Sequence, residues 1–144
     1  MFWADFGINA KIEQAYLTGQ NRQTFRYLRD SRLPSVFVVD FNSERLYLMF
    51  AQSYDYPYRI MSCKTLGGGY NYWRHMRNFR QHIHPVDLDL YGDHLYWPDR
   101  NSRSIYWINK THPRDMLSFG HVTDGILVGA VVFDESRQPY SKLN

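Results

Sequence analysis

Residues 2–5 read FWAD, and related stretches follow at residues 47–50, which read YLMF, and at residues 96–99, which read YWPD. The starts of the three stretches lie 45 and then 49 residues apart. Repetition with a period near that length is typical of chains that stack small β-sheet units, most often as the blades of a propeller. The sequence therefore predicts a repeat scaffold, and function has to be sought on its surfaces.

Each repeat carries the signals of several antiparallel strands. Strand-like runs near a proline occupy residues 33–40 and 84–91, and a short polar turn follows each run. A further strand is expected after each aromatic stretch, around Ile12, Ile60 and Ile105. With a weaker strand closing each unit, the pattern predicts four strands per repeat, which is the make-up of a propeller blade.

The order of motifs is similar to that of a known family. MFWADFG at residues 1–7 is followed by AKIEQA at 10–15 and TGQNR at 18–22. This order resembles the YWTD repeat of the low-density lipoprotein receptor family, whose consensus runs roughly YWTDWG, KIERA and DGSNR. HLYWPD at 94–99 is similar in the same way, and VVFDESRQP at 131–139 looks like the segment that ends such a propeller before an EGF-like module.

The resemblance implies an all-β fold: a partial β-propeller of the YWTD type, about three four-stranded blades of a six-bladed ring, from the C-terminal half of one propeller. Residues 1–32 would supply strands two to four of a blade, and residues 33–83 and 84–125 one complete blade each. Residues 126–144 would supply a closing strand and the start of a linker to an EGF-like module. An open arc of this kind would leave apolar faces in water. The favoured interpretation is therefore that the chain is a piece of a larger receptor, with Met1 an internal methionine; two copies joined head to tail into a ring are the alternative.

Four residues occupy matching positions in the first and third stretches. Trp3 and Trp97 are expected to pack between neighbouring blades, because large flat side chains fill the space there. Asp5 and Asp99 are expected to accept hydrogen bonds that join one blade to the next. The second stretch lacks both types, so its blade is expected to keep the strand without that polar contact.

A candidate partner-binding segment follows the glycine run at residues 67–69. It contains four residues of the types that dominate protein-binding hot spots. They are Tyr72, Trp73, Arg74 and His75. The same residues would equally suit a fourth strand packed beneath a neighbouring blade.

Three histidines suggest sensitivity to pH. His75, His82 and His84 lie close in sequence, and histidine changes charge between neutral and endosomal pH. Receptors of the resembled family use propeller histidines when they release ligand at low pH, so the resemblance implies this role for some of the three. Zinc binding by His82 and His84 is disfavoured, because no cysteine or carboxylate cluster accompanies them.

Enzyme and cofactor signatures are lacking in the sequence. The run at residues 67–69 has no lysine and hydroxyl where a phosphate-binding loop needs them. Asp87 and Asp89 alternate along a predicted strand and could hold calcium, as acids do in some propeller hydrolases, but solvated or cross-strand carboxylates are favoured. We therefore expect no catalytic residues, no metal and no cofactor.

The remaining features concern compartment and surface. Cys63 is the single cysteine, so no internal disulfide can form, and we expect it to be buried. Asn109 begins the sequon Asn-Lys-Thr, which favours a secreted chain. The net charge of +3 is spread rather than clustered, so no nucleic-acid partner is expected. The sequence has no signal peptide and no membrane-spanning apolar run, which a parent receptor would have to supply elsewhere.

These expectations combine into one predicted function. The chain resembles an extracellular propeller segment of an endocytic, single-pass lipoprotein receptor, present at the plasma membrane and in endosomes. Its expected partners are protein or lipoprotein ligands and adjoining EGF-like and complement-type modules. The alternatives are a matrix propeller similar to nidogen that binds laminin, a Wnt co-receptor propeller and a metal-dependent propeller hydrolase.

Overall fold

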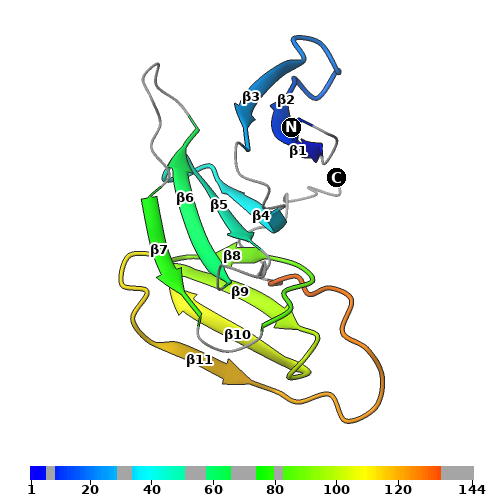
Figure 1. The fold of residues 1–144 in the computed structure, drawn as a ribbon, viewed down its shortest axis with the longest axis vertical. Helices are drawn as coiled ribbons and strands as arrows, with labels where there is room; N and C mark the ends of the chain where they lie inside the picture. The colour runs from blue at the N-terminus through cyan, green and yellow to red at the C-terminus, as the bar shows by residue number, and fades with distance from the viewer. Residues whose placement is uncertain (6–8, 29–33, 51–57, 66–73, 80–82, 134–144) are drawn as a thin grey trace, which may run out of the picture.

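The computed structural model describes residues 1–5, 9–28, 34–50, 58–65, 74–79 and 83–133. Every regular element among these residues is a strand, and the strands form three antiparallel sheets (Figure 1). The predicted all-β class is confirmed. No stretch of the described residues forms a helix of the length and apolar character needed to cross a membrane.

The first sheet has three strands in the order β1 (Phe2–Asp5), β2 (Lys11–Gln14) and β3 (Gln23–Tyr27). The register of β1 and β2 places Trp3 opposite Glu13. Side chains of directly opposite residues share one face of a sheet. Trp3 and Glu13 therefore lie together on one face, and Phe2, the neighbour of Trp3, lies on the other.

The second sheet has four strands in chain order: β4 (Pro34–Asp40), β5 (Arg45–Phe50), β6 (Arg59–Lys64) and β7 (Arg74–Asn78). Valine and phenylalanine fill the middle of β4, and leucine, methionine and aromatic residues fill β5, as expected for strands covered on both sides. The tight turn between β4 and β5 places Glu44 at a φ of 51°, in the left-handed region.

The third sheet repeats this plan with β8 (Asp89–Tyr91), β9 (His94–Asp99), β10 (Ser104–Asn109) and β11 (Met116–Phe119). Gly92 has a φ of 54° in the two-residue turn between β8 and β9, a conformation that glycine adopts at little cost. β8, the first strand of the third sheet, lies beside β4 of the second sheet, so the two sheets fan out from a shared inner edge (Figure 1).

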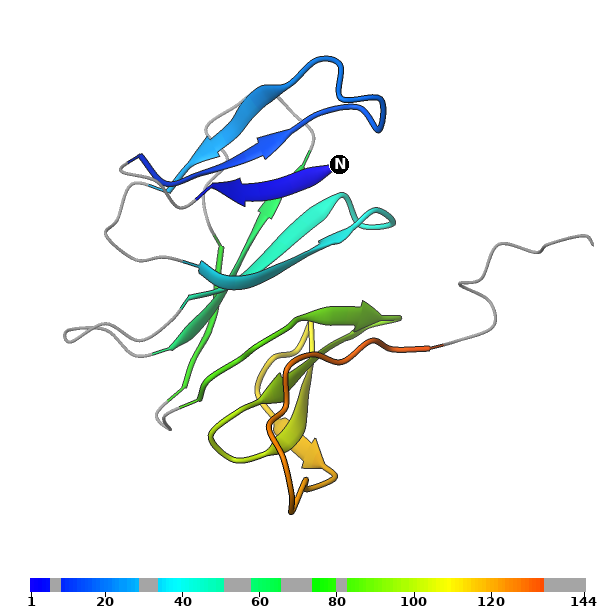
Figure 2. The same cartoon turned by 90° about the vertical axis from the view of Figure 1, so that its right-hand side faces the viewer.

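The sheets stack face to face, and Figure 2 shows them one above another. Alternate residues of β5 point to opposite sides. Leu46 and Leu48 pack with Ile12 of the first sheet, whereas Tyr47 and Met49 pack in a cluster with residues of the third sheet. Burying such a side chain contributes about 1.5–3 kcal/mol to the free energy of folding. The middle sheet therefore holds the arc together.

Two expected strands differ in the structure. Residues 84–91 were predicted to be one strand, but only residues 89–91 form β8. Before this strand, the carboxylate of Asp87 accepts a hydrogen bond from the Leu88 backbone N–H, and such a local bond competes with ladder pairing. Residues 126–133, the described part of the predicted closing strand, have no strand conformation; the backbone N–H groups of Ala130 and Val132 donate to the carboxylates of Asp87 and Asp89.

Candidate functional site

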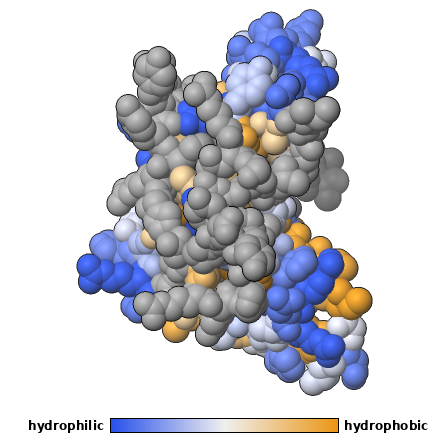
Figure 3. All heavy atoms as spheres, in the orientation of Figure 1, coloured by the Kyte–Doolittle hydropathy of each residue, from blue (hydrophilic) through white to orange (hydrophobic). Residues whose placement is uncertain are grey.

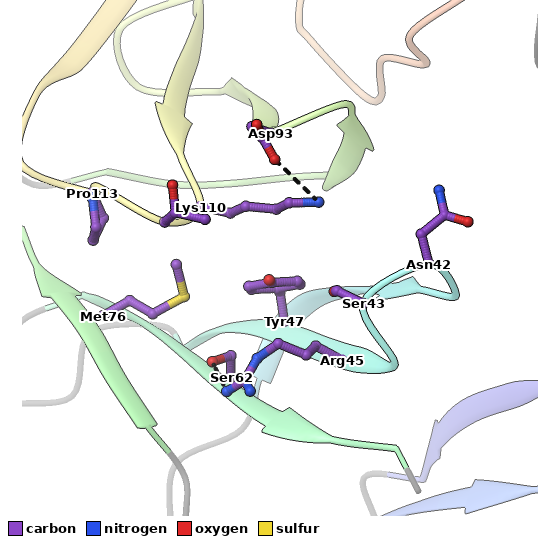
Figure 4. Close-up of a pocket in the computed structure, with 10 residues that line it drawn as sticks. Asn42, Ser43, Arg45, Tyr47, Ser62, Met76, Asp93, Lys110 and Pro113 are labelled. Carbon is purple, nitrogen blue, oxygen red and sulfur yellow. Dashed lines mark hydrogen bonds and ion pairs between the residues drawn. The ribbon is translucent and has the colours of Figure 1, made fainter.

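A cavity of about 410 Å³ opens between the second and third sheets (Figure 4). Three turns converge there: residues 41–44 between β4 and β5, residues 92–93 between β8 and β9, and the start of the β10–β11 connection. The lining residues are Asn42, Ser43, Arg45, Tyr47, Ser62, Met76, Asp93, Lys110, Thr111 and Pro113.

A buried ion pair closes one side of this cavity. Lys110 Nζ lies 2.6 Å from Asp40 Oδ2, and the two side chains are only 10% and 2% exposed. Asp40 also accepts hydrogen bonds from the backbone N–H groups of Asn42 and Ser43 and from the Ser43 hydroxyl, so its carboxylate is fully coordinated. Burial acts to raise the pKa of Asp40, but the hydrogen bonds from Lys110 and Ser43 outweigh it and hold that pKa below its usual range.

The rest of the cavity combines charge with an apolar floor. Asp93, whose side chain is 69% exposed, lies at the mouth 4.0 Å from Lys110 Nζ (Figure 4). Arg45 donates a hydrogen bond of 2.9 Å to the Ser62 hydroxyl. The Tyr47 ring lies between these polar groups in the same view. A wall of this kind suits the side chain of a binding partner, which needs apolar contact and a few fixed polar groups.

The residue that follows the predicted partner-binding segment, Met76, lines this cavity. Tyr72 and Trp73 lie outside the described residues, whereas Arg74 and His75 begin β7. The start of β7 therefore belongs to the same end of the sheets as the three turns.

The structure separates two of the three histidines that the sequence grouped, and His82 lies outside the described residues. His75 is at the cavity end of the second sheet, while His84 follows β7 and is exposed at the opposite end, where its backbone N–H donates to the Asp99 carboxylate. His112, which was not among the candidates from the sequence, lies beside the cavity. Its Nδ1 is 2.9 Å from the hydroxyl of Thr111, a lining residue.

Trp97 and Asp99 lie where the third sheet joins the second. The Trp97 side chain is fully buried, with its ring centroid 5.6 Å from that of Phe79 and stacked on Tyr106. Asp99 is 1% exposed, and it accepts hydrogen bonds from the His84 backbone and from the backbone and hydroxyl of Ser102. Asp99 thus fixes the segment that connects the two sheets.

Trp3 and Asp5 have different surroundings. The Trp3 indole donates a 3.1 Å hydrogen bond to Glu13, and the Arg22 guanidinium lies over its ring. Glu13 is 4% exposed, and the hydrogen bond from Arg22 contributes most to holding its pKa below the usual range. Asp5 lies 3.8 Å from Lys11 Nζ with 43% of its side chain exposed. Both residues are on the face of the first sheet opposite Phe2 and Ile12, which pack with the second sheet, and no other sheet of the described residues covers that face.

The other sequence candidates have structural partners. Asp87 and Asp89 accept hydrogen bonds from the backbone N–H groups of Ala130 and Val132, which attach the C-terminal segment to the inner edge of the third sheet. In the described parts of the chain, no three His, Cys, Asp or Glu side chains are grouped in a way that could hold a metal ion.

The sequon and the cysteine are placed as follows. Asn109 ends β10, and its Oδ1 accepts hydrogen bonds from Thr111 and from the His112 backbone in an exposed turn. Cys63 is fully buried between the first and second sheets, and burial raises the pKa of its thiol to about 11.

The sequence analysis missed the cavity itself. Its walls come from turns far apart in the chain, and the pairing of Asp40 with Lys110 spans 70 residues. One local signal was available: Asp40 is followed three residues later by Ser43, a spacing typical of a turn that hydrogen-bonds to its own backbone.

No protein-family model matches the chain. Among solved structures, it is similar to a chain in the crystal structure of a nidogen/laminin complex, with a TM-score of 0.64 and 23% sequence identity. The match covers 84% of this chain and 42% of that chain, so this chain spans about two fifths of the matched protein's length. The likeness shows the fold: three sheets of a partial β-propeller of the YWTD type, as the sequence predicted.

Proposed function

We propose that this chain is a protein-binding propeller segment of an extracellular endocytic receptor similar to the low-density lipoprotein receptor family. The order of its sequence motifs supports the family, and the Asn109 sequon supports an extracellular location. Its ligands are proteins or lipoproteins, and EGF-like and complement-type modules adjoin it in the parent chain. The observation that carries a binding role is the cavity between the two sheets, with fixed polar groups around an apolar floor.

Binding at this cavity needs no large rearrangement. The ion pair of Asp40 and Lys110 connects the two sheets that form the walls, and the hydrogen bonds to Asp40 fix the first turn. A site that is already ordered loses less conformational entropy when a partner binds. The propeller acts as a rigid scaffold that presents its turns to a ligand and performs no chemistry on it.

Ligand release in endosomes is the second part of this proposal. His75 at the start of β7, His94 directly after Asp93 and His112 beside Thr111 lie at the cavity end of the described chain. Histidine as a residue type gains positive charge between neutral and endosomal pH, and added positive charge at this end of the sheets would weaken the binding of a cationic ligand group. Of the other candidates from the sequence, His84 lies at the opposite end of the sheets, beside Asp99, and His82 lies outside the described residues.

A matrix function similar to that of nidogen is the second candidate. The observation that favours it is the likeness to a chain from a nidogen/laminin complex. The cavity would serve either function, because both need a rigid surface for a protein partner. The two differ in the partner and in the dependence on pH.

Surface plasmon resonance with the immobilised chain tests the proposal. Lipoprotein particles and laminin are passed over it at neutral pH and at about pH 5.5, within the endosomal range. Binding of lipoprotein that weakens in acid supports the receptor; binding of laminin alone supports the matrix protein. The variant Asp93→Lys at the cavity mouth should reduce binding, while Asp124→Lys, an equal charge change at an exposed residue outside the cavity, should not. Equal binding by both variants and the parent chain would contradict a role for the cavity.

A further inference from the structure

We propose that the cavity between the second and third sheets receives a carboxylate of the protein ligand, from an aspartate or glutamate side chain, on the guanidinium of Arg45 and the hydroxyl of Tyr47. The inference rests on the proposed binding role of this cavity, and it adds the chemical class of the group that enters. A cationic group of the same ligand segment would lie outside, at the mouth, near Asp93.

Arg45 is a half-buried cation in the cavity wall. The register of β4 and β5 places it directly opposite Asp40, whose carboxylate would be the expected partner. That carboxylate is already bound by Lys110 Nζ at 2.6 Å and by the turn that follows Asp40. Among the described residues, the Arg45 side chain bonds only to the Ser62 hydroxyl, at 2.9 Å. Its other N–H groups can therefore donate to a second acceptor.

Tyr47 supplies a second donor in the same wall. It lies two residues after Arg45 in β5, so the two side chains share one face of the sheet. Tyr47 is only 3% exposed and lines the cavity between Lys110 and Arg45 (Figure 4). A buried tyrosine hydroxyl usually has a hydrogen-bond partner, but no group in the described parts of the chain bonds to this one. One oxygen of an entering carboxylate can accept from Arg45 and the other from Tyr47.

The balance of charge favours a single carboxylate. Lys110 and Asp40 neutralise each other, which leaves Arg45 as the lining cation without a countercharge in the described structure. Lys64, directly opposite Arg45 on β6, adds positive charge nearby. Asp93 at the mouth, with 69% of its side chain exposed, would repel a multiply charged anion such as phosphate. A group with one negative charge therefore suits the site best.

The rim of the cavity indicates a protein segment as the source of the carboxylate. Phe41, which is 77% exposed, directly precedes the lining residue Asn42 and offers apolar contact at the first turn. Asp93 offers an ionic contact at the second turn. A volume of about 410 Å³ is sufficient for one acidic side chain. An acidic residue beside a basic or apolar one, on an exposed loop of the ligand, would use all of these groups.

The C-terminal segment presents a different kind of surface. Hydrophobic residues gather over residues 126–133 (Figure 3), where Ile126, Val128, Val131 and Phe133 are at least 71% exposed. A carboxylate that moved from water onto such a surface would lose hydration without gaining hydrogen bonds. Residues 126–133 therefore form a reference region that an acidic ligand group should leave unaffected.

A nuclear magnetic resonance titration of the 144-residue chain at neutral pH tests the carboxylate directly. The probe is N-acetyl-aspartate methylamide, and the control is its asparagine analogue, which has nearly the same shape without the charge. The aspartate probe should shift the signals of Arg45 and Ser62, leave those of residues 126–133 in place, and bind about tenfold more tightly than the control. Inorganic phosphate should bind more weakly than the aspartate probe. Equal binding of aspartate and asparagine probes, or tighter binding of phosphate, would overturn the proposal.

Four variants test the two donors. Arg45→Met should reduce the affinity for the aspartate probe to that for the asparagine analogue, and Tyr47→Phe, which keeps the buried ring, should reduce it several-fold. Arg100→Met and Tyr27→Phe replace exposed residues of the same types outside the cavity and should bind the probe as the parent chain does. Parent-like affinity in Arg45→Met would overturn the proposal.

The same variants separate this inference from the binding role on which it rests. In surface plasmon resonance with lipoprotein particles or laminin, Arg45→Met should weaken binding about tenfold, and Arg100→Met should not. If Arg45→Met binds as the parent does while Asp93→Lys binds more weakly, the cavity is a binding site but does not take a carboxylate, and this inference alone is wrong. If neither variant weakens binding, the proposed role of the cavity is wrong as well.

Discussion

Lys110 Nζ lies 2.6 Å from Asp40 Oδ2, and this single contact joins the end of a strand in the second sheet to the end of a strand in the third. Because both side chains are almost fully buried, removing one partner leaves an unpaired charge inside the protein. The pair therefore determines both the stability of the arc and the shape of the cavity.

The variant Lys110→Met is expected to lower the free energy of unfolding by about 3–5 kcal/mol, since it leaves the Asp40 carboxylate buried without its cation. Chemical denaturation checks this. The double variant Asp40→Leu with Lys110→Met should recover part of the loss. Because the folded-state pKa of Asp40 is lowered, the stability that it contributes is present at neutral pH and is lost as the pH falls through that lowered pKa. A parent chain and a Lys110→Met variant of equal stability would contradict the importance of the pair.

Asp99 and Asp5 offer a matched comparison between repeat positions. Asp99→Asn should cost about 1–3 kcal/mol of unfolding free energy, because a buried acceptor of three hydrogen bonds is altered. Asp5→Asn, at a side chain that is 43% exposed, should change stability by less than about 0.5 kcal/mol. Thermal denaturation of the two variants measures the difference. Similar effects at both positions would show that Asp5 has buried partners equivalent to those of Asp99.

Cys63 is expected to be chemically inert in the folded chain. Burial raises the pKa of its thiol to about 11, so the reactive thiolate is scarce at neutral pH. A thiol-reactive dye should label the folded chain far more slowly than the denatured chain. Because the folded-state pKa is raised, the stabilising effect is present at neutral pH and is lost as the pH rises from about 9 to about 11, and Cys63→Ala should remove this part of the pH dependence. Rapid labelling under native conditions would contradict the burial.

Asn109 should carry a glycan when the chain is made in a secretory pathway. It lies at the end of β10 next to an exposed turn, where a bulky sugar is tolerated. Thr111→Ala removes the sequon while keeping Asn109, and Lys64→Ala changes an exposed residue outside the sequon as a control. Mass spectrometry should find the glycan in the parent and the control and not in Thr111→Ala. A parent chain without a glycan would contradict the prediction.

The fold was predictable because its signals are local and repeated. The aromatic stretches at residues 2–5, 47–50 and 96–99 lie in β1, β5 and β9. β5 and β9 are the second strands of their four-stranded sheets, and β1 has the corresponding place in the three-stranded sheet. Both faces of β5 carry apolar side chains, as expected for a sheet that is covered on both faces by neighbouring sheets. Period and alternation together were sufficient to indicate stacked antiparallel sheets.

The site was much less predictable. The sequence around Asp40 does not indicate that it pairs with Lys110, because a contact across 70 residues depends on how two sheets stack. His75 and His84 are close in sequence but lie at opposite ends of the second sheet, because β7 runs between them. Trp3 and Trp97 share a repeat position, yet among the described residues only Trp97 packs against a neighbouring sheet on its face.

Hydrogen exchange with mass spectrometry can locate the binding surface on the propeller. The chain is compared alone and saturated with whichever of lipoprotein particles or laminin it binds. If the cavity is the site, residues 41–44, 92–93 and 110–115 should exchange more slowly in the complex, while residues 15–22 should not change. A complex in which the three turns exchange at the same rate as in the free chain would contradict binding at the cavity.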